Sequence, residues 1–267
     1  TLQVEVTADV ACTLSLTPLT AMSALGWYSG DTESDMSHGG GVYTCDETDA
    51  LIACEAEDLD AIVCESGGAE FTGTPTTSGG RAVFTTYEMR HQRYGHLCPI
   101  LAQGLPDSTF WATNLSPCLN DIADSLAAAG PSPDLLILQN HPSEYLPNFR
   151  VEEFWSNSGS ANWPREAISL AWHRVLDAYD AIFCSDGLTR TRLQHIWNSG
   201  IKLTATGGTD SALNALASPP PGSVRTYAKL DGAFTFSAWA EAIRDGHTFA
   251  TNGPIFTAFT VDGADPG

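Results

Sequence analysis

Carboxylates and histidines recur where short apolar segments of the sequence begin or end, and these residues could bind a divalent metal ion. Glu88 closes one such segment and His96 opens the next. His141 follows the run "LILQN" and precedes a proline, which keeps the residue before it extended. Asp210 follows "TATGG", whose glycines let other groups approach closely. Carboxylate oxygens and imidazole nitrogens are common ligands of divalent ions.

Each of these residues also has a structural explanation that the sequence leaves open. Glu88 and His96 could be a surface acid and a loop histidine. His141 could cap the end of its strand, and Asp210 could cap a helix over "SALNAL". The metal-site interpretation gains weight from their placement, because active sites in α/β folds form at the carboxyl ends of strands.

A pair of acids stands in the stretch "GWYSGDTESDMSHGG", residues 26–40, which has the pattern of a strand running into a turn. Glu33 and Asp35 are two residues apart, so both point to the same side of an extended strand. The pair could therefore be metal ligands at a strand end or part of a solvated acidic turn.

The elements that must position these residues alternate between strand-like and helix-like segments. Short apolar runs predict strands at 59–66, 82–89, 96–104, 134–140, 180–185 and 201–208. Apolar spacing with terminal Asn, Pro or Gly predicts helices at 120–130, 164–180 and 189–200. The last part of the chain has the pattern strand, helix, strand, strand. This alternation predicts an α/β fold with a parallel sheet or barrel, and the helical Trp172, Trp197 and Trp239 are expected in its core.

Composition limits the partners that this chain can have. The 267 residues include 32 Asp and Glu against 12 Lys and Arg, a net charge of −20, which argues against nucleic acid and anionic membranes. No apolar run is long enough to be a transmembrane segment. Seven cysteines without a CxxC pair argue against a zinc finger, and with few lysines they indicate a secreted, periplasmic or cell-surface protein.

The first residues, "LQVEVTADVACTLSLTPL", alternate polar and apolar types as a strand does. We expect residues 1–23 to be the end of a preceding β module or a linker, and residues 24–267 to form the main α/β domain. Other domains of a longer chain are expected as partners.

The order of motifs resembles that of a known enzyme superfamily. An acid pair, "AEDL", Glu followed by Gly-His, His-Pro and Gly-Thr-Asp resemble the PHP superfamily of metallohydrolases, named after polymerase and histidinol phosphatase. The phrases "IWNSGIKLTATGGTDS", "VRTY" and "AWAEAIRDGHTFATNGP" resemble its CehA/McbA-like branch, as do "GWYSGDT" and "AEDLD". The resemblance covers residues 24–267 and implies a PHP-like distorted (β/α) barrel after the short N-terminal β segment.

The resemblance also implies a chemistry. Two or three divalent ions, with Mn, Mg, Zn and Ca all open, activate water to attack a phosphoester, carbamate or ester in a small-molecule substrate. The residues on ligand positions, which are the implied catalytic residues, are Glu88, His96, His141 and Asp210. Asp58 falls on the second motif, where Leu59 replaces the usual histidine.

One departure from the family pattern changes the expected site. Where the family has His-x-His after "GDT", this chain has Glu33 and Asp35, and carboxylates favour harder ions such as Mg, Mn or Ca over Zn. Two hypotheses remain. One is a metal-dependent hydrolase with an altered, carboxylate-rich site, and the other is a catalytically degenerate barrel that serves as a structural or binding module of an exported protein.

Three further residues are candidates for substrate binding. Arg90, two residues after Glu88, could bind an anionic oxygen or form a surface ion pair. Arg225 and Tyr227 in "VRTY" recur in the CehA/McbA-like branch, so the resemblance places them at the mouth of the site, although Tyr227 could equally be a core residue.

Overall fold

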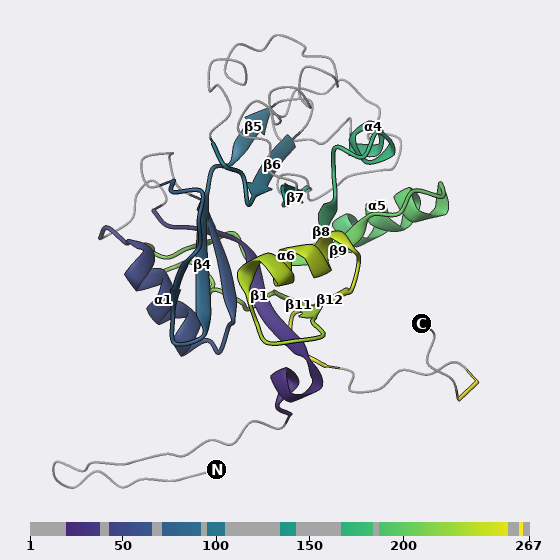
Figure 1. The fold of residues 1–267 in the computed structure, drawn as a ribbon. Coiled ribbons are helices and arrows are strands. Elements are labelled where there is room, and N and C mark those ends of the chain that lie inside the picture. The colour runs from purple at the N-terminus through teal and green to yellow at the C-terminus, as the bar shows by residue number, and fades with distance from the viewer. Residues whose placement is uncertain are drawn as a thin grey trace, which may run out of the picture.

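The described part of the chain is a mixed α/β fold built on two sheets (Figure 1). The computed structural model describes residues 20–37, 43–65, 71–91, 95–104, 134–142, 167–183, 187–255 and 262–263. The expected β segment over residues 1–19, the expected helix over 120–130 and most of the last expected strand lie outside these residues. None of the described helices is long and apolar enough to cross a membrane.

The first sheet carries the acid-rich strand. Its order is β12 (Thr248–Thr251), β11 (Arg225–Lys229), β1 (Trp27–Asp35), β2 (Ala61–Glu65), β4 (Arg81–Thr86) and β3 (Thr76–Ser78), with β10 (Ser211–Ala212) paired to the end of β1. Strands β1, β2 and β4 are parallel, whereas β11, β12 and β3 pair antiparallel with their neighbours. The carboxyl ends of the three parallel strands therefore share one edge of the sheet.

The second sheet carries the histidines. Its order is β5 (Met89–His91), β6 (Gly95–Ile100), β7 (Leu136–Asn140), β8 (Ala178–Phe183) and β9 (Thr204–Gly208). Strands β7, β8 and β9 are parallel, and β5 and β6 run antiparallel to their neighbours. Because β6 is antiparallel to β7, its beginning lies at the carboxyl end of β7, with His96 opposite Asn140.

The two sheets contact each other along both sides. Strand β9 lies against β1, β11 and β12, and β4 lies against β6. No ladder of hydrogen bonds joins one sheet to the other among the residues described, so the expected barrel is not closed there. The α/β class is confirmed, and the strand ends of both sheets face a common region.

The helices are η1 (Met22–Leu25), a 3-10 turn, and α1 (Glu47–Ala56), α4 (Ala167–Trp172), α5 (Gly187–Asn198) and α6 (Phe236–Arg244). Asp46 caps α1 by accepting hydrogen bonds from the backbone N–H groups of Thr48 and Asp49, as its short acidic side chain favours. The helix expected over 164–180 is wrong in its second half, because residues 178–183 form β8 inside the sheet. Burial of an apolar strand outweighed helical spacing there.

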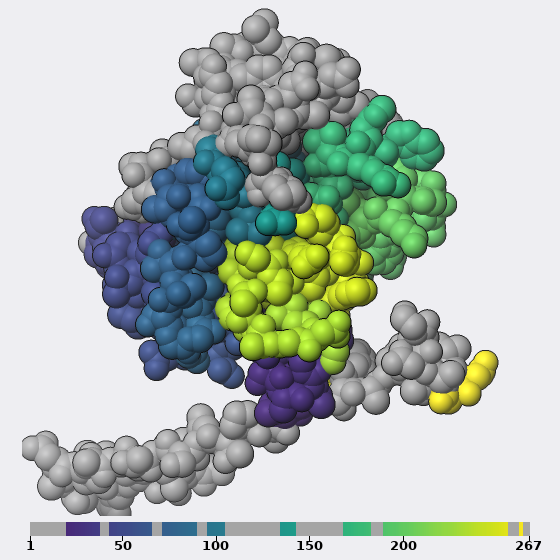
Figure 2. All heavy atoms as spheres, in the orientation of Figure 1, coloured from purple at the N-terminus to yellow at the C-terminus, as the bar shows by residue number. Residues whose placement is uncertain are grey.

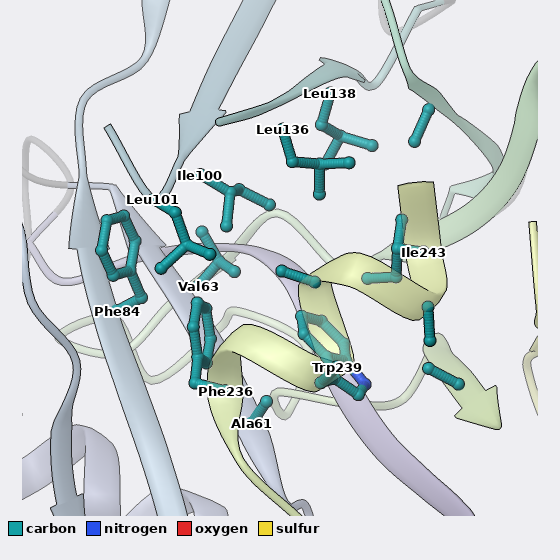
Figure 3. Close-up of a cluster of buried hydrophobic side chains, with 14 of the residues drawn as sticks. Ala61, Val63, Phe84, Ile100, Leu101, Leu136, Leu138, Phe236, Trp239 and Ile243 are labelled. Atoms are coloured by element: carbon teal, nitrogen blue, oxygen red, sulfur yellow. The ribbon is translucent and has the colours of Figure 1, made fainter. Parts of the chain in front are cut away.

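Helix α6 closes one side of the core between the two sheets. Figure 3 shows Trp239 and Phe236 of α6 among residues from β2, β4, β6 and β7. The rings of Phe236 and Phe84 stack with centroids 5.3 Å apart, and Trp239 is fully buried. In the space-filling view, the α6 segment lies between the β4 side and the α4–α5 side (Figure 2).

Only one of the three helical tryptophans is a core residue. Trp239 is buried as expected, but Trp172 is 69% exposed and Trp197 is 47% exposed. Trp172 is the last residue of α4 and Trp197 is the second-last residue of α5, and the indole N–H of Trp197 donates a hydrogen bond to the carbonyl oxygen of Leu203. The prediction that all three are core residues, which rested on their apolar side chains and helical spacing, was therefore wrong for Trp172 and Trp197.

Candidate metal centre

The centre of the site is a buried carboxylate between two buried imidazoles. Glu88 follows β4, His96 lies in β6 and His141 follows β7, and all three are at most 7% exposed. The Glu88 Oε1 atom is 3.0 Å from Nε2 of His141 and also contacts Nδ1 of His96. The two imidazole nitrogens are 3.0 Å from each other. These three residues offer one ligand atom each within 4.8 Å of one another.

A second group of ligands joins the first sheet to His141. Oε1 of Glu33, in β1, is 3.1 Å from Nε2 of His141, and Glu33 is 1% exposed. Asp210, between β9 and β10, completes this group within 4.8 Å. The backbone N–H of Asp210 donates a hydrogen bond of 2.9 Å to the carbonyl oxygen of Glu33, so the two residues are held side by side.

Glu65 is a member of the centre that the sequence analysis missed. It is the last residue of β2 and forms a third group with Glu33 and Glu88. Asn140, at the end of β7, donates a hydrogen bond from Nδ2 to Oε1 of Glu65. The sequence contained an indication of this role. Glu65 stands near the end of the strand predicted over 59–66, as Glu88 stands near the end of the strand predicted over 82–89.

Asp180 is a further buried carboxylate behind the centre. It lies within β8 and accepts hydrogen bonds at Oδ1 from Thr32 Oγ1 at 3.1 Å and from Thr206 Oγ1 at 2.8 Å. Asp180 is the residue where the helix expected over 164–180 meets the strand predicted over 180–185, and it was not among the expected site residues. In the structure it lies inside β8, away from both ends of the strand, where no site residue was expected.

Burial and crowding raise the pKa values of most of these carboxyl groups. Burial, followed by the charges of Asp210 and Asp180, raises the pKa of Glu33 well above its ordinary range. Burial and the charge of Glu88 do the same to the pKa of Glu65. Like charges that are brought together away from water are stabilised when a cation binds between them.

Glu88 behaves differently from its neighbours because it touches both histidines. Burial by itself would raise the pKa of Glu88, but hydrogen bonds from His141 and His96 outweigh that effect and hold this pKa well below its usual value. Glu88 is therefore the carboxylate of the centre that stays ionised most readily.

The remaining candidate ligands, Asp35 and Asp58, belong to none of the three ligand groups. Asp35 is half-buried opposite Glu65 in the neighbouring strand. Asp58 precedes β2, and its exposed carboxylate is 3.7 Å from Nη2 of Arg81. Asp58 precedes the beginning of β2, and Glu65 is at the end of that strand. The length of β2 between these two ends is about 13 Å at the ordinary rise of a strand.

Two of the candidate substrate residues have structural partners away from the ligand groups. Arg225 donates hydrogen bonds to the carbonyl oxygens of Gly222 at 2.8 Å and Glu57 at 3.2 Å. Tyr227 is buried in β11, and its ring stacks on that of Phe249 with centroids 5.0 Å apart. This placement agrees with the alternative that Tyr227 is a core residue. Arg90 lies in β5, and its side chain is outside the part of the chain that the structure describes.

Lowering the pH from 7 to about 5.5 is expected to stabilise the metal-free protein. Burial raises the pKa of Asp180 from 3.8 to about 6, with hydrogen bonds from Thr206, Glu33 and Thr32 opposing it. The folded protein then binds a proton that the unfolded chain has released, so stability falls as pH rises from 3.8 through about 6. The pKa values of Glu33 and Glu65 shift in the same direction, whereas Glu88 titrates below this window.

Urea unfolding at the two pH values in a chelator measures this effect as a difference in the free energy of unfolding. Saturating Mn²⁺ should remove most of the loss of stability at pH 7, because a cation favours the ionised carboxylates. A metal-free protein that is more stable at pH 7 than at pH 5.5 would contradict the expectation.

The fold and the site together define an α/β protein whose strand ends converge on a buried set of carboxylates and imidazoles. Glu88, His96 and His141 form the nitrogen-containing side of this set, and Glu33 and Glu65 form its oxygen side. Such a mixed donor set is typical of a divalent metal site.

Comparison with solved structures agrees with this class of fold. PsfC from Pseudomonas syringae superposes with a TM-score of 0.53 at 15% identity, over 85% of this chain and 91% of PsfC. A two-domain protein from Bacteroides vulgatus, containing a predicted PHP-like metal-dependent phosphoesterase, superposes with a TM-score of 0.53 at 12% identity, over 91% of this chain and 69% of that protein. No family model matches the sequence, and no curated protein matches it.

A third similar structure is the lesion-specific endonuclease EndoQ from Pyrococcus furiosus. It superposes with a TM-score of 0.50 at 12% identity, over 84% of this chain and 57% of the endonuclease. At these identities the likeness concerns the fold alone, and the chain has a mixed α/β fold similar to that of these proteins.

Proposed function

We propose that this protein is a metal-dependent hydrolase of the PHP type with a carboxylate-rich centre. The observation that carries the proposal is the sharing of members among the three ligand groups. Glu88, Glu33 and His141 each belong to two groups, so neighbouring ions would share ligands. Four residues expected from sequence as catalytic ligands, Glu88, His96, His141 and Asp210, are all in these groups.

The donor set fits divalent ions of two kinds. The group of Glu88, His96 and His141 supplies two imidazoles, which suit Zn²⁺, and one carboxylate, which also suits Mn²⁺. The group of Glu33, Glu65 and Glu88 supplies oxygen atoms alone, which suit Mg²⁺, Mn²⁺ or Ca²⁺. Mn²⁺ binds carboxylate oxygens, which both groups supply, and we propose it as the first ion to test.

Ions held there would supply Lewis acidity and activated water for attack on an electrophile. The chain's own residues set the geometry. Glu88 joins the two histidines, and Asn140 orients Glu65 through its amide. Thr32 and Thr206 hold Asp180 in place behind Glu33.

The substrate that we propose is a small phosphoester, carbamate or ester. The phrases shared with the CehA/McbA-like branch support this finer assignment, and the net charge of −20 supports a small molecule over nucleic acid. One similar structure is an endonuclease, so the exclusion of nucleic acid stays a prediction. The acidic composition and scarce lysine also support our proposal of an exported protein.

Protein purified without chelator is expected to contain at least one divalent ion per chain, measured by elemental analysis. His141→Ala should lose most of it, because His141 belongs to two ligand groups. His195→Ala is the matched control, since His195 is exposed on α5 and belongs to none of them. Turnover of phosphoester, carbamate and ester substrates is then measured with the ion that binds.

A metal-free protein whose thermal stability does not change with Mn²⁺, Mg²⁺, Zn²⁺ or Ca²⁺ would overturn the hydrolase proposal. That result would favour a degenerate barrel that acts as a structural or binding module. Equal metal content in His141→Ala and His195→Ala would place the ion elsewhere in the chain.

A further inference from the structure

Asp31 is a fully buried carboxylate that lies two residues before Glu33 and accepts four hydrogen bonds. At Oδ1 it accepts from the backbone N–H of Glu33 at 3.1 Å and of Thr209 at 3.0 Å. At Oδ2 it accepts from the backbone N–H of Gly222 at 2.7 Å and from the hydroxyl of Thr209. One side chain of β1 thereby joins this strand to the segments around Thr209 and Gly222, which are far from it in sequence.

An irregularity in β1 explains why the backbone needs this acceptor. Strands β1 and β2 pair Asp31 with Ile62 and then Ser34 with Cys64, so two residues of β1 lie opposite one residue of β2. Such a bulge interrupts the ladder and leaves a backbone N–H without its strand partner. A buried N–H requires an acceptor, and the Asp31 carboxylate supplies one to Glu33.

The same carboxylate fixes the segment that carries Asp210. It accepts from Thr209, the residue directly before Asp210, while the Asp210 N–H donates to the Glu33 carbonyl oxygen. Asp210 has a left-handed backbone with φ of 51°, a conformation that costs energy in a residue with a side chain. These bonds hold it in that conformation.

We propose that Asp31 is the positioning residue that sets Glu33 and Asp210 at the separation required for binding a shared divalent ion. This inference rests on the proposed function, because it treats both residues as metal ligands. The Gly222 loop is the third support of the arrangement. Arg225 donates to the Gly222 carbonyl oxygen at 2.8 Å, so the loop is held from both sides.

The chemistry of the contact requires a carboxylate at position 31. Three of the four donors are backbone N–H groups, which cannot turn into acceptors. Asp31→Asn replaces one acceptor oxygen by an NH₂ group that would face donors. The substitution keeps the size of the side chain, so its effect reports the lost hydrogen bonds rather than a cavity.

The test compares Asp31→Asn with Asp60→Asn in the whole chain. Asp60 is a matched control, because its carboxylate also accepts a hydrogen bond from a backbone N–H of β1, that of Ser29 at 2.8 Å. Asp60 directly precedes β2, so it lies at the opposite end of that strand from Glu65. Both variants lose stability in urea unfolding. Titration calorimetry with Mn²⁺ should show affinity lowered by about 10- to 100-fold in Asp31→Asn and unchanged in Asp60→Asn.

A second readout keeps the outcome independent of the proposed function. Amide hydrogen exchange at Glu33, Thr209 and Gly222 should accelerate in Asp31→Asn and stay slow in Asp60→Asn. If the unmodified protein binds no divalent ion, the hydrolase proposal fails, and this exchange still decides whether Asp31 orders the segments. Equal Mn²⁺ affinity in Asp31→Asn and the unmodified protein, or unchanged exchange, would overturn the positioning role.

Discussion

Glu88→Gln is expected to abolish tight binding of divalent ions while the protein stays folded. Glu88 contacts both imidazoles of the centre and belongs to two of the three ligand groups. The substitution keeps the shape of the side chain but removes the charge that holds both histidines. An uncharged amide is also a poor metal ligand. The affinity for Mn²⁺ should therefore fall by at least about 100-fold, which is the upper end of the loss caused by changes to residues that only support metal ligands.

Titration calorimetry with Mn²⁺ measures this loss, and circular dichroism checks that the variant is folded. Glu47→Gln is the matched control, because Glu47 is a half-buried carboxylate that accepts hydrogen bonds from Thr76 and Thr85 outside the ligand groups. Glu47→Gln should bind Mn²⁺ as the unmodified protein does. A Glu88→Gln variant with unchanged affinity would show that the three ligand groups do not bind the ion.

Trp239→Ala is expected to cost about 3–5 kcal/mol of the free energy of unfolding, as large-to-small changes of buried aromatic residues do. Trp239 is fully buried in α6, and its indole N–H donates to the Tyr28 carbonyl oxygen at 3.2 Å. Its ring lies so close to Gly30 that a Cβ there would be 2.4 Å from a ring carbon. Deletion of the ring therefore opens a cavity directly against the backbone of β1.

Urea unfolding measures this cost, with Trp172→Ala as the control. Trp172 is 69% exposed, so its removal should change the free energy of unfolding by less than about 0.5 kcal/mol. Because β1 carries Glu33, Trp239→Ala should also weaken Mn²⁺ binding at temperatures where the variant is still folded. Equal stability of the two alanine variants would contradict the assignment of α6 to the core.

The sequence by itself indicated where most of the strands end and which side chains could bind a metal ion. Apolar runs that stop at an acid or a histidine mark where a buried strand reaches the edge of a sheet, and this is a local property. Glu88, His96, His141 and Asp210 were selected by this placement together with the resemblance to the PHP superfamily, and each lies where a strand ends or begins. The resemblance to the PHP superfamily also led us to expect Glu33 and Asp35 at the positions of a His-x-His pair.

Only the tertiary structure decided which of these acids meet. Glu65 and Asp180 belong to apolar strands, and their proximity to Glu33 depends on which strands are neighbours, which no local pattern records. Asp58 in "AEDL" was expected as a ligand from the family resemblance, but it lies before β2, at the opposite end of that strand from Glu65. The bulge in β1, which leaves the Glu33 N–H to be accepted by Asp31, likewise arises from pairing with β2. Strand order and register result from long-range packing, whereas residue spacing specifies only the direction in which each strand presents its side chains.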